Sequence, residues 1–592
     1  MKRKHLWKKA MALGCGAMLA AALFAGCGSA STAQGSVGST ESSASTSEDG
    51  SISAENESAD TGSYVVSEMT LDTSDMFTDR DLDASYNEAD AVTVTLSDSG
   101  ITASDDSVEI DGQTVTIKEE GVYVFSGSLS DGQIIVDADD AAKVQIVLNG
   151  VDITSKTSAA VYVKSADKVF LTAAEGTDNT LTNTDAYEAD GDEEINAVIY
   201  AKDDLTINGT GNLTINAANG DGINAKDDLK LVDVTLTVDA ADHAISANDS
   251  IRIASGTYDL TAETDGLHIS NDEDGEKGYL YMLDGTVSIT CGSDGVDASG
   301  MIQIDGGSME VNAGDDGIHS EAKLLVNGGT ISVPACEEGL EGYVVVINDG
   351  EIDITSNDDG INATSGNGNA MMGGPGQKNT ETATATSKED TTSYTYTGDV
   401  DLAINGGVIT IDTEGDGIDS NGTITITSGE TYINGPSNSG NGSMDVGDGY
   451  EATITGGIVV ATGADGMAEN FGSNSTQGAI LQSVSSTDGE VTLTDADGNE
   501  LISFTPSKTY SSILISTPDI KSGETYTLTT GGTSTTIEMT DLIYGQAQGM
   551  GGPGMQGGPN MENGEQMQGG PGMKGGRQMP GEQDQTQSDQ AQ

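Results

Sequence analysis

A short unit recurs along this chain at an interval of about 22 residues, and it constrains the fold more than any other feature. Each copy has an acidic residue, a glycine, one aliphatic residue and then polar or small residues, as in DGVDA. The copies begin at Asp221, Asp265, Asp294, Asp316, Glu338, Asp359, Asp416 and Asp465, with a degenerate copy, HAISA, at His243. Insertions fall between copies, which is typical of a solenoid built from one repeated unit.

Alignment of the copies predicts two columns of stacked side chains. The position after the glycine is always apolar: Ile223, Ile245, Leu267, Val296, Ile318, Leu340, Ile361, Ile418 and Met467. A position four residues before the glycine holds small residues: Ala218, Ala240, Ala262, Cys291, Ala313, Ala335, Ser356, Thr413 and Thr462. Runs of alternating apolar residues between glycine pairs predict short strands joined by tight turns. The sequence therefore predicts an all-β fold, a right-handed parallel β-helix solenoid with about 22 residues per coil.

The repeat also divides the chain into segments. The predicted β-helix covers residues 64–478, with a disordered low-complexity insert at 364–393. Residues 479–544 break the period and are predicted to form antiparallel strands, with hairpin turns at Asp497-Gly498 and Gly531-Gly532. We expect this segment to be a C-terminal β cap or a small β-sandwich, because an uncovered solenoid end would recruit other chains. Residues 545–592 are rich in Met, Gly and Pro and are predicted to be a disordered tail.

The first residues carry an export signal. A basic stretch and an apolar run precede Phe24-Ala25-Gly26-Cys27, and small residues before a cysteine resemble the lipobox of bacterial lipoproteins. Residues 1–27 are therefore predicted to be a lipoprotein signal peptide with lipidation at Cys27, and residues 28–63 a disordered Ser-rich tether. The protein is expected outside the cytoplasm, lipid-anchored at the cell membrane and displayed on the cell surface. The alternative is a plain secretory signal that releases the chain.

Two cysteines, Cys291 and Cys336, remain after processing. The repeat places them about two coils apart, roughly 10 Å at the spacing of stacked strands, which exceeds the reach of a disulfide. Two free thiols are predicted.

The net charge of the chain limits the kinds of partner that it can bind. Asp and Glu number 96 against 23 Lys and Arg, which gives a formal net charge of −73. This charge repels nucleic acid and anionic membrane surfaces, so no nucleic-acid partner is expected and the only membrane contact is the lipid anchor. The chain is expected to be a monomer and to bind cations.

Stacking of the repeats brings acidic residues within about 5 Å of one another, so a counter-charge is required. Ca²⁺ fits best because it accepts six to eight oxygen ligands. The predicted ligands form two groups: Asp294, Asp297, Asp315, Asp316, Glu337, Glu338 and Glu341, and then Asp358, Asp359, Asp416 and Asp419. The alternative for each member is a turn-forming role, in which an aspartate accepts backbone N–H bonds. His268 and His319 lie next to acids and could be ligands or solvated side chains.

Several stretches outside the repeat complete a family resemblance. They are MFTDRDLDASY at 76–86, DGQIIVDADDAAKVQIVLNGVDI at 131–153, VYVKSADKVFLTAAEGTDNTL at 161–181 and AKDDLTINGTGNLTI at 201–215. With the DGI repeats, they make the chain resemble a bacterial family of secreted, calcium-binding carbohydrate-binding proteins with a polysaccharide-lyase-like parallel β-helix. The resemblance implies a non-catalytic module that binds cellulosic or acidic pectic glycans of the plant cell wall, with Ca²⁺ as its cofactor. Tyr258, Tyr279, Tyr281 and Tyr432 are either sugar-stacking platforms or core residues.

Two other functions stay open. A Ca²⁺-dependent, pectate-type polysaccharide lyase would need a basic residue beside a bound uronate, and Lys202, Lys226 and Arg252 are the candidates. The competing interpretation is that the two lysines pair with the adjacent Asp203, Asp204, Asp227 and Asp228, and a shared fold does not imply lyase activity. A structural surface spacer or adhesin is the other alternative, which would bind no sugar saturably.

Overall fold

The structure is a computed structural model, and it describes residues 62–545 except for 192, 272 and 366–393. The predicted signal peptide, the tail from 546 and nearly all of the tether and the insert lie outside the described residues. Helix is limited to two short 3₁₀ turns, Val66–Glu68 and Thr73–Asp75, in the part of the chain that the structure describes. No helix among these residues is long and apolar enough to cross a membrane.

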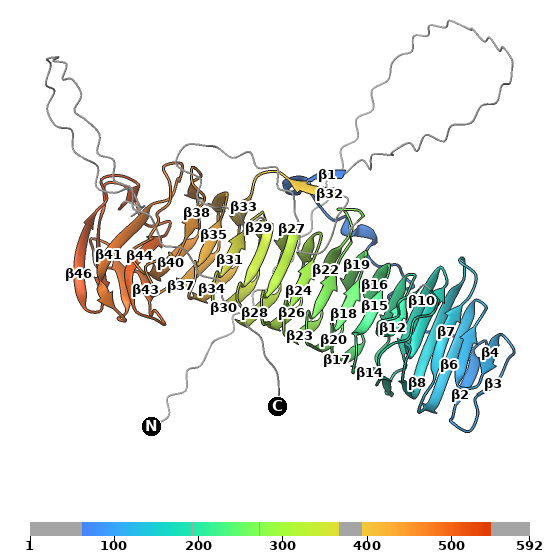
Figure 1. Cartoon of the computed structure of the whole chain (residues 1–592). Helices are drawn as coiled ribbons and strands as arrows, with labels where there is room; N and C mark the ends of the chain where they lie inside the picture. The colour runs from blue at the N-terminus through green and yellow to red at the C-terminus, as the bar shows by residue number, and fades with distance from the viewer. Residues whose placement is uncertain (1–61, 192, 272, 366–393, 546–592) are drawn as a thin grey trace, which may run out of the picture. The chain divides into compact units, whose positions relative to one another are not determined.

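Parallel pairing between every third strand dominates the fold. Strands of one repeat hydrogen-bond to the matching strands of the next, so that three ladders combine into one 41-stranded sheet. Figure 1 shows the strands of successive repeats side by side in chain order. The chain is thus an all-β protein with a large, mostly parallel sheet.

The first ladder contains the strands that follow the acid-glycine units. These are β5 (Thr114–Ile117), β7 (Gln133–Asp137), β9 (Val161–Ser165), β12 (Ala197–Ala201), β15 (Asp221–Ala225), β18 (Ile245–Ala247), β21 (Leu267–Ile269), β24 (Val296–Ala298), β27 (Ile318–Val326), β29 (Leu340–Ile347), β31 (Ile361–Ala363), β35 (Ile418–Ser420) and β38 (Asp445–Val446).

The second ladder follows the first in each repeat and includes the later halves of β27 and β29. Its other strands are β2 (Val92–Leu96), β6 (Gly121–Leu129), β8 (Lys143–Ser155), β10 (Lys168–Ala173), β13 (Leu205–Asn208), β16 (Asp228–Leu231), β19 (Ser250–Ile253), β22 (Tyr279–Met282), β25 (Ile302–Ile304), β33 (Asp401–Ile404), β36 (Thr423–Ile426) and β39 (Ala452–Ile454).

The third ladder begins with the ends of β6 and β8. It continues through β11 (Asp178–Asn183), β14 (Asn212–Ala217), β17 (Thr235–Ala240), β20 (Thr257–Ala262), β23 (Thr286–Cys291), β26 (Ser308–Asn312), β28 (Thr330–Ala335), β30 (Glu351–Ser356), β34 (Val408–Thr413), β37 (Glu430–Asn434) and β40 (Ile458–Gly463).

The core lies between the ladders, and the predicted apolar column forms one row of it. Ile223, Ile245, Leu267, Val296, Ile318, Leu340, Ile361 and Ile418 pair in register in the first ladder and are buried. The ninth member was placed wrongly: Met467 is only half-buried, while its neighbour Ala468 is buried. In the small-residue column, Ala217 rather than Ala218 pairs with Ala240, because the turn before β15 holds one more residue than the next one.

The glycine of each unit is required by close packing. A Cβ on Gly295 would lie 2.1 Å from the Val311 side chain and 2.4 Å from the Gly317 carbonyl oxygen. Gly317 and Gly339 meet the same kind of contacts in the following repeats. Any side chain at this position would therefore push the core and the next repeat apart, which explains why glycine recurs there.

Additional strands flank the ladders at both of their ends. At the first end, β3 (Thr102–Ala103) and β4 (Val108–Asp111) pair antiparallel with β2 and β5. At the other, β40 and β41 (Ala479–Thr487) pair antiparallel with β44 (Tyr510–Ser516), and β47 (Ile543–Tyr544) adds to β41. The two hairpins expected from the sequence are present in a separate antiparallel sheet of β42 (Val491–Thr494), β43 (Glu500–Phe504), β45 (Thr525–Thr530) and β46 (Thr533–Glu538).

Two segments cross the outer face of the second ladder. Residues 76–86, which we call the strap, lie over β8 to β22, with contacts from Gln145 to Tyr281. Strand β1 (Gly62–Val65) pairs with β32 (Tyr394–Thr397), and Tyr64 of β1 packs with Tyr394 and Tyr396 of β32 against β27 and β29. The strap was not predicted, because its contacts join residues that are far apart in sequence and follow no period.

Candidate metal and carbohydrate site

The acid of each repeat lies at the entrance of a first-ladder strand and has one structural task. Asp265 Oδ1 accepts a hydrogen bond from the backbone N of Asp294 (3.0 Å), and Asp294 Oδ1 accepts one from Asp316 (2.8 Å). Asp359 and Asp416 accept equivalent bonds. The turn-forming alternative is thus correct for one oxygen of these aspartates. The second oxygen of Asp265 contacts His243 and His268, whereas the second oxygens of Asp294, Asp359 and Asp416 can accept another partner.

Histidines alternate with acids in part of the first ladder. His243 Nδ1 and His268 Nδ1 lie 3.1 and 3.2 Å from Asp265 Oδ2, and His268 Nδ1 lies 3.1 Å from Asp297 Oδ2. His319 Nδ1 lies 3.1 Å from Asp297 Oδ1. Although burial opposes its charge, the two neighbouring carboxylates raise the pKa of His268 to about 10. Burial opposes the charge of Asp265 and Asp297 as well, but the histidines beside them hold the pKa values of both carboxyls well below the usual range. Imidazolium groups therefore neutralise this part of the ladder.

Beyond the histidines, the acids face mainly other acids. Burial raises the pKa of each half-buried member, and the nearest carboxylates add to the rise. The pKa is about 7 for Asp294, Asp316, Glu338, Glu341 and Asp359, about 6 for Asp416 and about 8 for Asp419. At neutral pH these groups must take up protons or bind a cation.

The structure brings the members of the first predicted group together. Carboxylate oxygens of Asp294, Asp315 and Asp316 lie within 4.8 Å of one another, and Asp294, Asp297 and His319 form a second such cluster. Ligands of one Ca²⁺ ion lie at most about 5 Å apart, twice the usual Ca–O distance, so this spacing suits a single ion. Asp315, Glu337 and Asp358 are exposed to solvent.

The second predicted group is longer than the sequence indicated. Asp419 pairs in register with Asp445, and Glu469 lies close enough for its pKa to be raised to about 7 by burial and by Asp445. The sequence pattern made Asp465 the acid that follows Asp416, but Asp465 is exposed and bonds to Ser511. The loop between these two repeats is irregular, so the spacing of the copies did not reveal that Asp445 matches Asp419. The only sequence signal was the acid in the stretch MDVGD.

The three basic residues considered for lyase chemistry are not brought together. Lys202 and Lys226 follow paired residues of the first ladder, as their spacing predicted. Lys202 is paired with Glu193 at 2.7 Å, and Lys226 Nζ lies 5.5 Å from the Tyr200 ring centroid. Arg252 belongs to the second ladder and pairs with Asp228 at 2.6 Å. Lys202 and Arg252 thus pair with acids, but neither lysine forms the ion pair with an adjacent aspartate that the sequence suggested.

The other sequence candidates occupy structural positions. Tyr258 and Tyr281 are buried, whereas Tyr279 lies beneath Arg252 and Tyr432 is half-buried against Phe504. Cys291 and Cys336 are free thiols, and burial raises their pKa values to about 11 and 12.

The fold and the site define a class of all-β repeat protein with an extended row of carboxylates along one ladder. The chain belongs to the family described as "Carbohydrate-binding domain-containing protein", whose model matches residues 111–343 and 300–442. A relative of that description from Acetivibrio thermocellus is 36% identical over 195 residues, which cover 33% of this chain and 68% of the relative.

A solved structure is also similar in sequence. It is titled as the polysaccharide lyase-like protein from C. thermocellum, in a gadolinium derivative, and is 36% identical. The match covers 40% of this chain and 96% of that one, with a TM-score of 0.39.

Proposed function

We propose that this protein binds polysaccharide outside the cell without cleaving it, through a right-handed parallel β-helix that requires Ca²⁺. Membership of the carbohydrate-binding family supports the ligand class. Three in-register parallel ladders that recur with every repeat support the β-helix, since such pairing arises when a chain winds repeatedly in one direction.

The observation that carries the Ca²⁺ requirement is the run of acids from Asp294 to Asp419. Seven of them are half-buried, namely Asp294, Asp316, Glu338, Glu341, Asp359, Asp416 and Asp419, and burial and neighbouring carboxylates raise their pKa values. Protonation would neutralise them only below about neutral pH. A hard divalent cation that accepts several oxygens neutralises them at any pH above that. Its remaining coordination positions can accept carboxylate or hydroxyl oxygens of an acidic pectic glycan.

The proposed location rests on the first residues of the sequence. Removal of a signal peptide before Cys27 would leave a lipidated cysteine and a Ser-rich tether in front of the β-helix. This arrangement would hold the carbohydrate-binding body at the outer surface of the cell membrane.

The absence of cleavage is proposed from the state of the basic residues. A lyase base must lose its proton near neutral pH, yet the pKa of Lys202 is raised because Glu193 stabilises its charge. Arg252 is held by Asp228. Neither side chain is suited to abstract a proton.

The test is a binding assay on the mature chain with polygalacturonate and with cellulose, in Ca²⁺ and in EDTA, while the absorbance of unsaturated sugar products is followed. Saturable binding in Ca²⁺ that EDTA strongly weakens, with no product, is expected. Product release would establish a lyase, and the lack of saturable binding to either glycan would favour a spacer or adhesin.

A further inference from the structure

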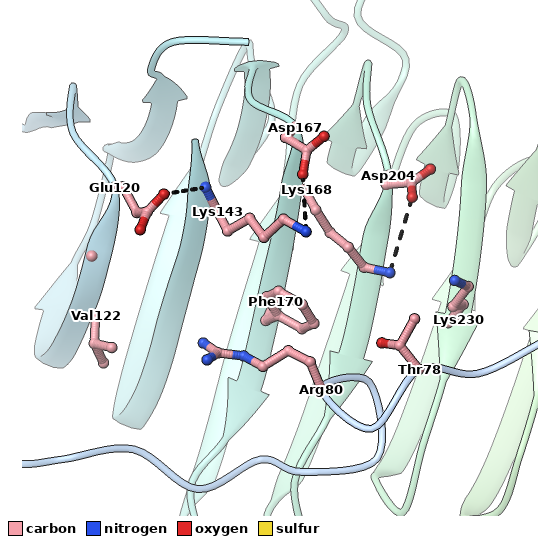
Figure 2. A pocket seen from close by; sticks show the side chains of 11 residues that line it. Thr78, Arg80, Glu120, Val122, Lys143, Asp167, Lys168, Phe170, Asp204 and Lys230 are labelled. Atoms are coloured by element: carbon pink, nitrogen blue, oxygen red, sulfur yellow. Dashed lines mark hydrogen bonds and ion pairs between the residues drawn. The ribbon is translucent and has the colours of Figure 1, made fainter. Parts of the chain in front are cut away.

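A cavity of about 540 Å³ opens between the strap and the second ladder, outside the row of acids. Its volume falls within the range of pockets that bind small ligands. The residues that line it are Thr78, Arg80, Glu120, Gly121, Val122, Lys143, Asp167, Lys168, Phe170, Asp204 and Lys230. Four of them are basic in a chain whose net charge is −73. Figure 2 shows these four side chains around Phe170.

The floor of the cavity is fixed by a buried ion-pair network. Asp81 is fully buried, and its two carboxylate oxygens lie 2.7 Å from Lys168 Nζ and 3.4 Å from Lys230 Nζ. Thr206 also donates to Asp81. Burial and the adjacent Lys168 lower the pKa of Lys230. Two lysines thus share the Asp81 carboxylate, and Lys168 also lies 4.0 Å from Asp204.

The rim carries a cation that is only partly satisfied. The Arg80 guanidinium donates to Gln145 Oε1 at 3.1 Å and stacks on the Phe170 ring, 4.9 Å from its centroid. Arg80 is exposed and forms no ion pair with the described acids. A guanidinium has five N–H donors, so several remain for a ligand, and its fork matches a carboxylate.

A second rim cation can exchange partners. Lys143 pairs with Asp167 at 3.2 Å, but 58% of the Lys143 side chain is exposed. Exposed pairs contribute only about 0–1 kcal/mol, so a bound carboxylate can compete for this ammonium group. Asp204 and Glu120 supply acceptors for sugar hydroxyls at the edges of the same cavity.

We propose that this cavity binds the carboxylate of a uronic-acid unit of the polysaccharide, held directly by Arg80 and Lys143 without a metal ion. The inference rests on the proposed function, because it assumes an acidic polysaccharide as the ligand. It adds an anion-binding site that works independently of Ca²⁺.

The test uses the mature chain and titrates a galacturonic-acid hexamer and a cellulose-derived hexamer, both in Ca²⁺ and in EDTA. R80Q and K143Q each remove one rim charge from an exposed side chain. K156Q is the matched control, because Lys156 is 50% exposed and pairs with Asp131 at 3.0 Å outside the cavity. Melting temperature reports whether each variant is folded.

R80Q and K143Q are each expected to weaken binding of the acidic hexamer about tenfold, the effect of losing one charge-assisted hydrogen bond. Binding of the neutral hexamer and the behaviour of K156Q should match the wild type. Wild-type affinity for the acidic hexamer in both R80Q and K143Q would overturn the inference and leave the proposed function standing. An equal loss of affinity for both hexamers would also overturn it, because the site would then not distinguish a sugar that has a carboxylate from one that lacks it. A wild-type chain that binds neither hexamer would overturn the proposed function itself.

Discussion

Asp81 and Lys168 form a buried ion pair, with Lys168 Nζ 2.7 Å from Asp81 Oδ1, that fastens the strap to the second ladder. Asp81 has no exposed surface, and 9% of the Lys168 side chain is exposed. Removing one partner of a buried pair leaves an uncompensated charge. This contact is the main electrostatic link between residues 76–86 and the repeats that they cover.

D81N is therefore expected to lower the free energy of unfolding by about 3 kcal/mol, because Lys168 and Lys230 lose their shared carboxylate. Urea unfolding at pH 7 measures the change. D79N, two residues away at an exposed position, should change the stability by less than about 0.5 kcal/mol. Equal stabilities of D81N and D79N would contradict the account of the strap.

Substitution within the row of acids should act through the metal ion. In the double variant D294N/D316N, two carboxylates that repel each other are neutralised. The variant should lose most of the rise in melting temperature that Ca²⁺ gives the wild type, and in EDTA it should be at least as stable as the wild type. D353N changes an exposed acid of the third ladder and should keep the full response to Ca²⁺. A normal Ca²⁺ response in D294N/D316N would exclude these residues as ligands.

The raised pKa values predict a pH dependence for the metal-free protein. A carboxyl whose pKa is about 7 in the folded chain and about 4 in the unfolded chain binds more protons when folded between these values. Its contribution to stability is present below pH 4 and is lost as the pH rises to 7. His268 acts in the same direction, since its stabilising charge is lost as the pH rises from about 6.5 towards 10.

In EDTA, the urea midpoint should therefore be higher at pH 5 than at pH 8, and Ca²⁺ should remove most of the difference. Unfolding curves at the two pH values, with and without Ca²⁺, measure it. A metal-free protein that is more stable at pH 8 would contradict the assignment of these carboxyls.

His268 should be the most important of the ladder histidines. H268Q removes the charge shared by Asp265 and Asp297 and is expected to cost about 2 kcal/mol of stability. H243Q should cost roughly half as much, because His243 contacts only the first of these ladder acids. Chemical denaturation of both variants at pH 6 distinguishes them, and an unchanged H268Q would show that the histidines are merely solvated.

The close packing of the repeat glycines gives a matched pair of substitutions at the start of β29. G339A places a Cβ 2.3 Å from the Gly360 carbonyl oxygen and 2.5 Å from Ile354, and should destabilise the protein by about 3 kcal/mol. A Cβ on Gly342 meets only contacts of 3.5 Å, so G342A should cost less than about 1 kcal/mol. Thermal unfolding compares the two, and equal losses would show that the glycine is not required by packing.

The sequence predicted what its period determines. Ile223 and Ile318 lie in one buried column because a constant interval between glycines places equivalent residues in successive rungs. The acids beside them were found for the same reason. Where the interval changed, the prediction failed: Asp465 does not follow Asp416 in the row, which continues instead from Asp419 to Asp445.

Contacts without a period could not be predicted. Asp81 meets Thr206 and Lys230 across a long stretch of chain, and nothing in the spacing of these residues announces that the strap covers the second ladder. The alternation of His268 and His319 with Asp265 and Asp297 was visible in the aligned columns. That the histidines neutralise these aspartates depends on the directions of their side chains, which only the structure shows.

The central claim is that the row from Asp294 to Asp419 binds Ca²⁺, and calorimetric titration of EDTA-treated mature protein with CaCl₂ at pH 7.5 tests it most directly. The account predicts saturable binding of at least one ion per chain, release of protons from the carboxyls of raised pKa, and a higher melting temperature at saturation. A titration without saturable heat, together with an unchanged melting temperature, would contradict the account.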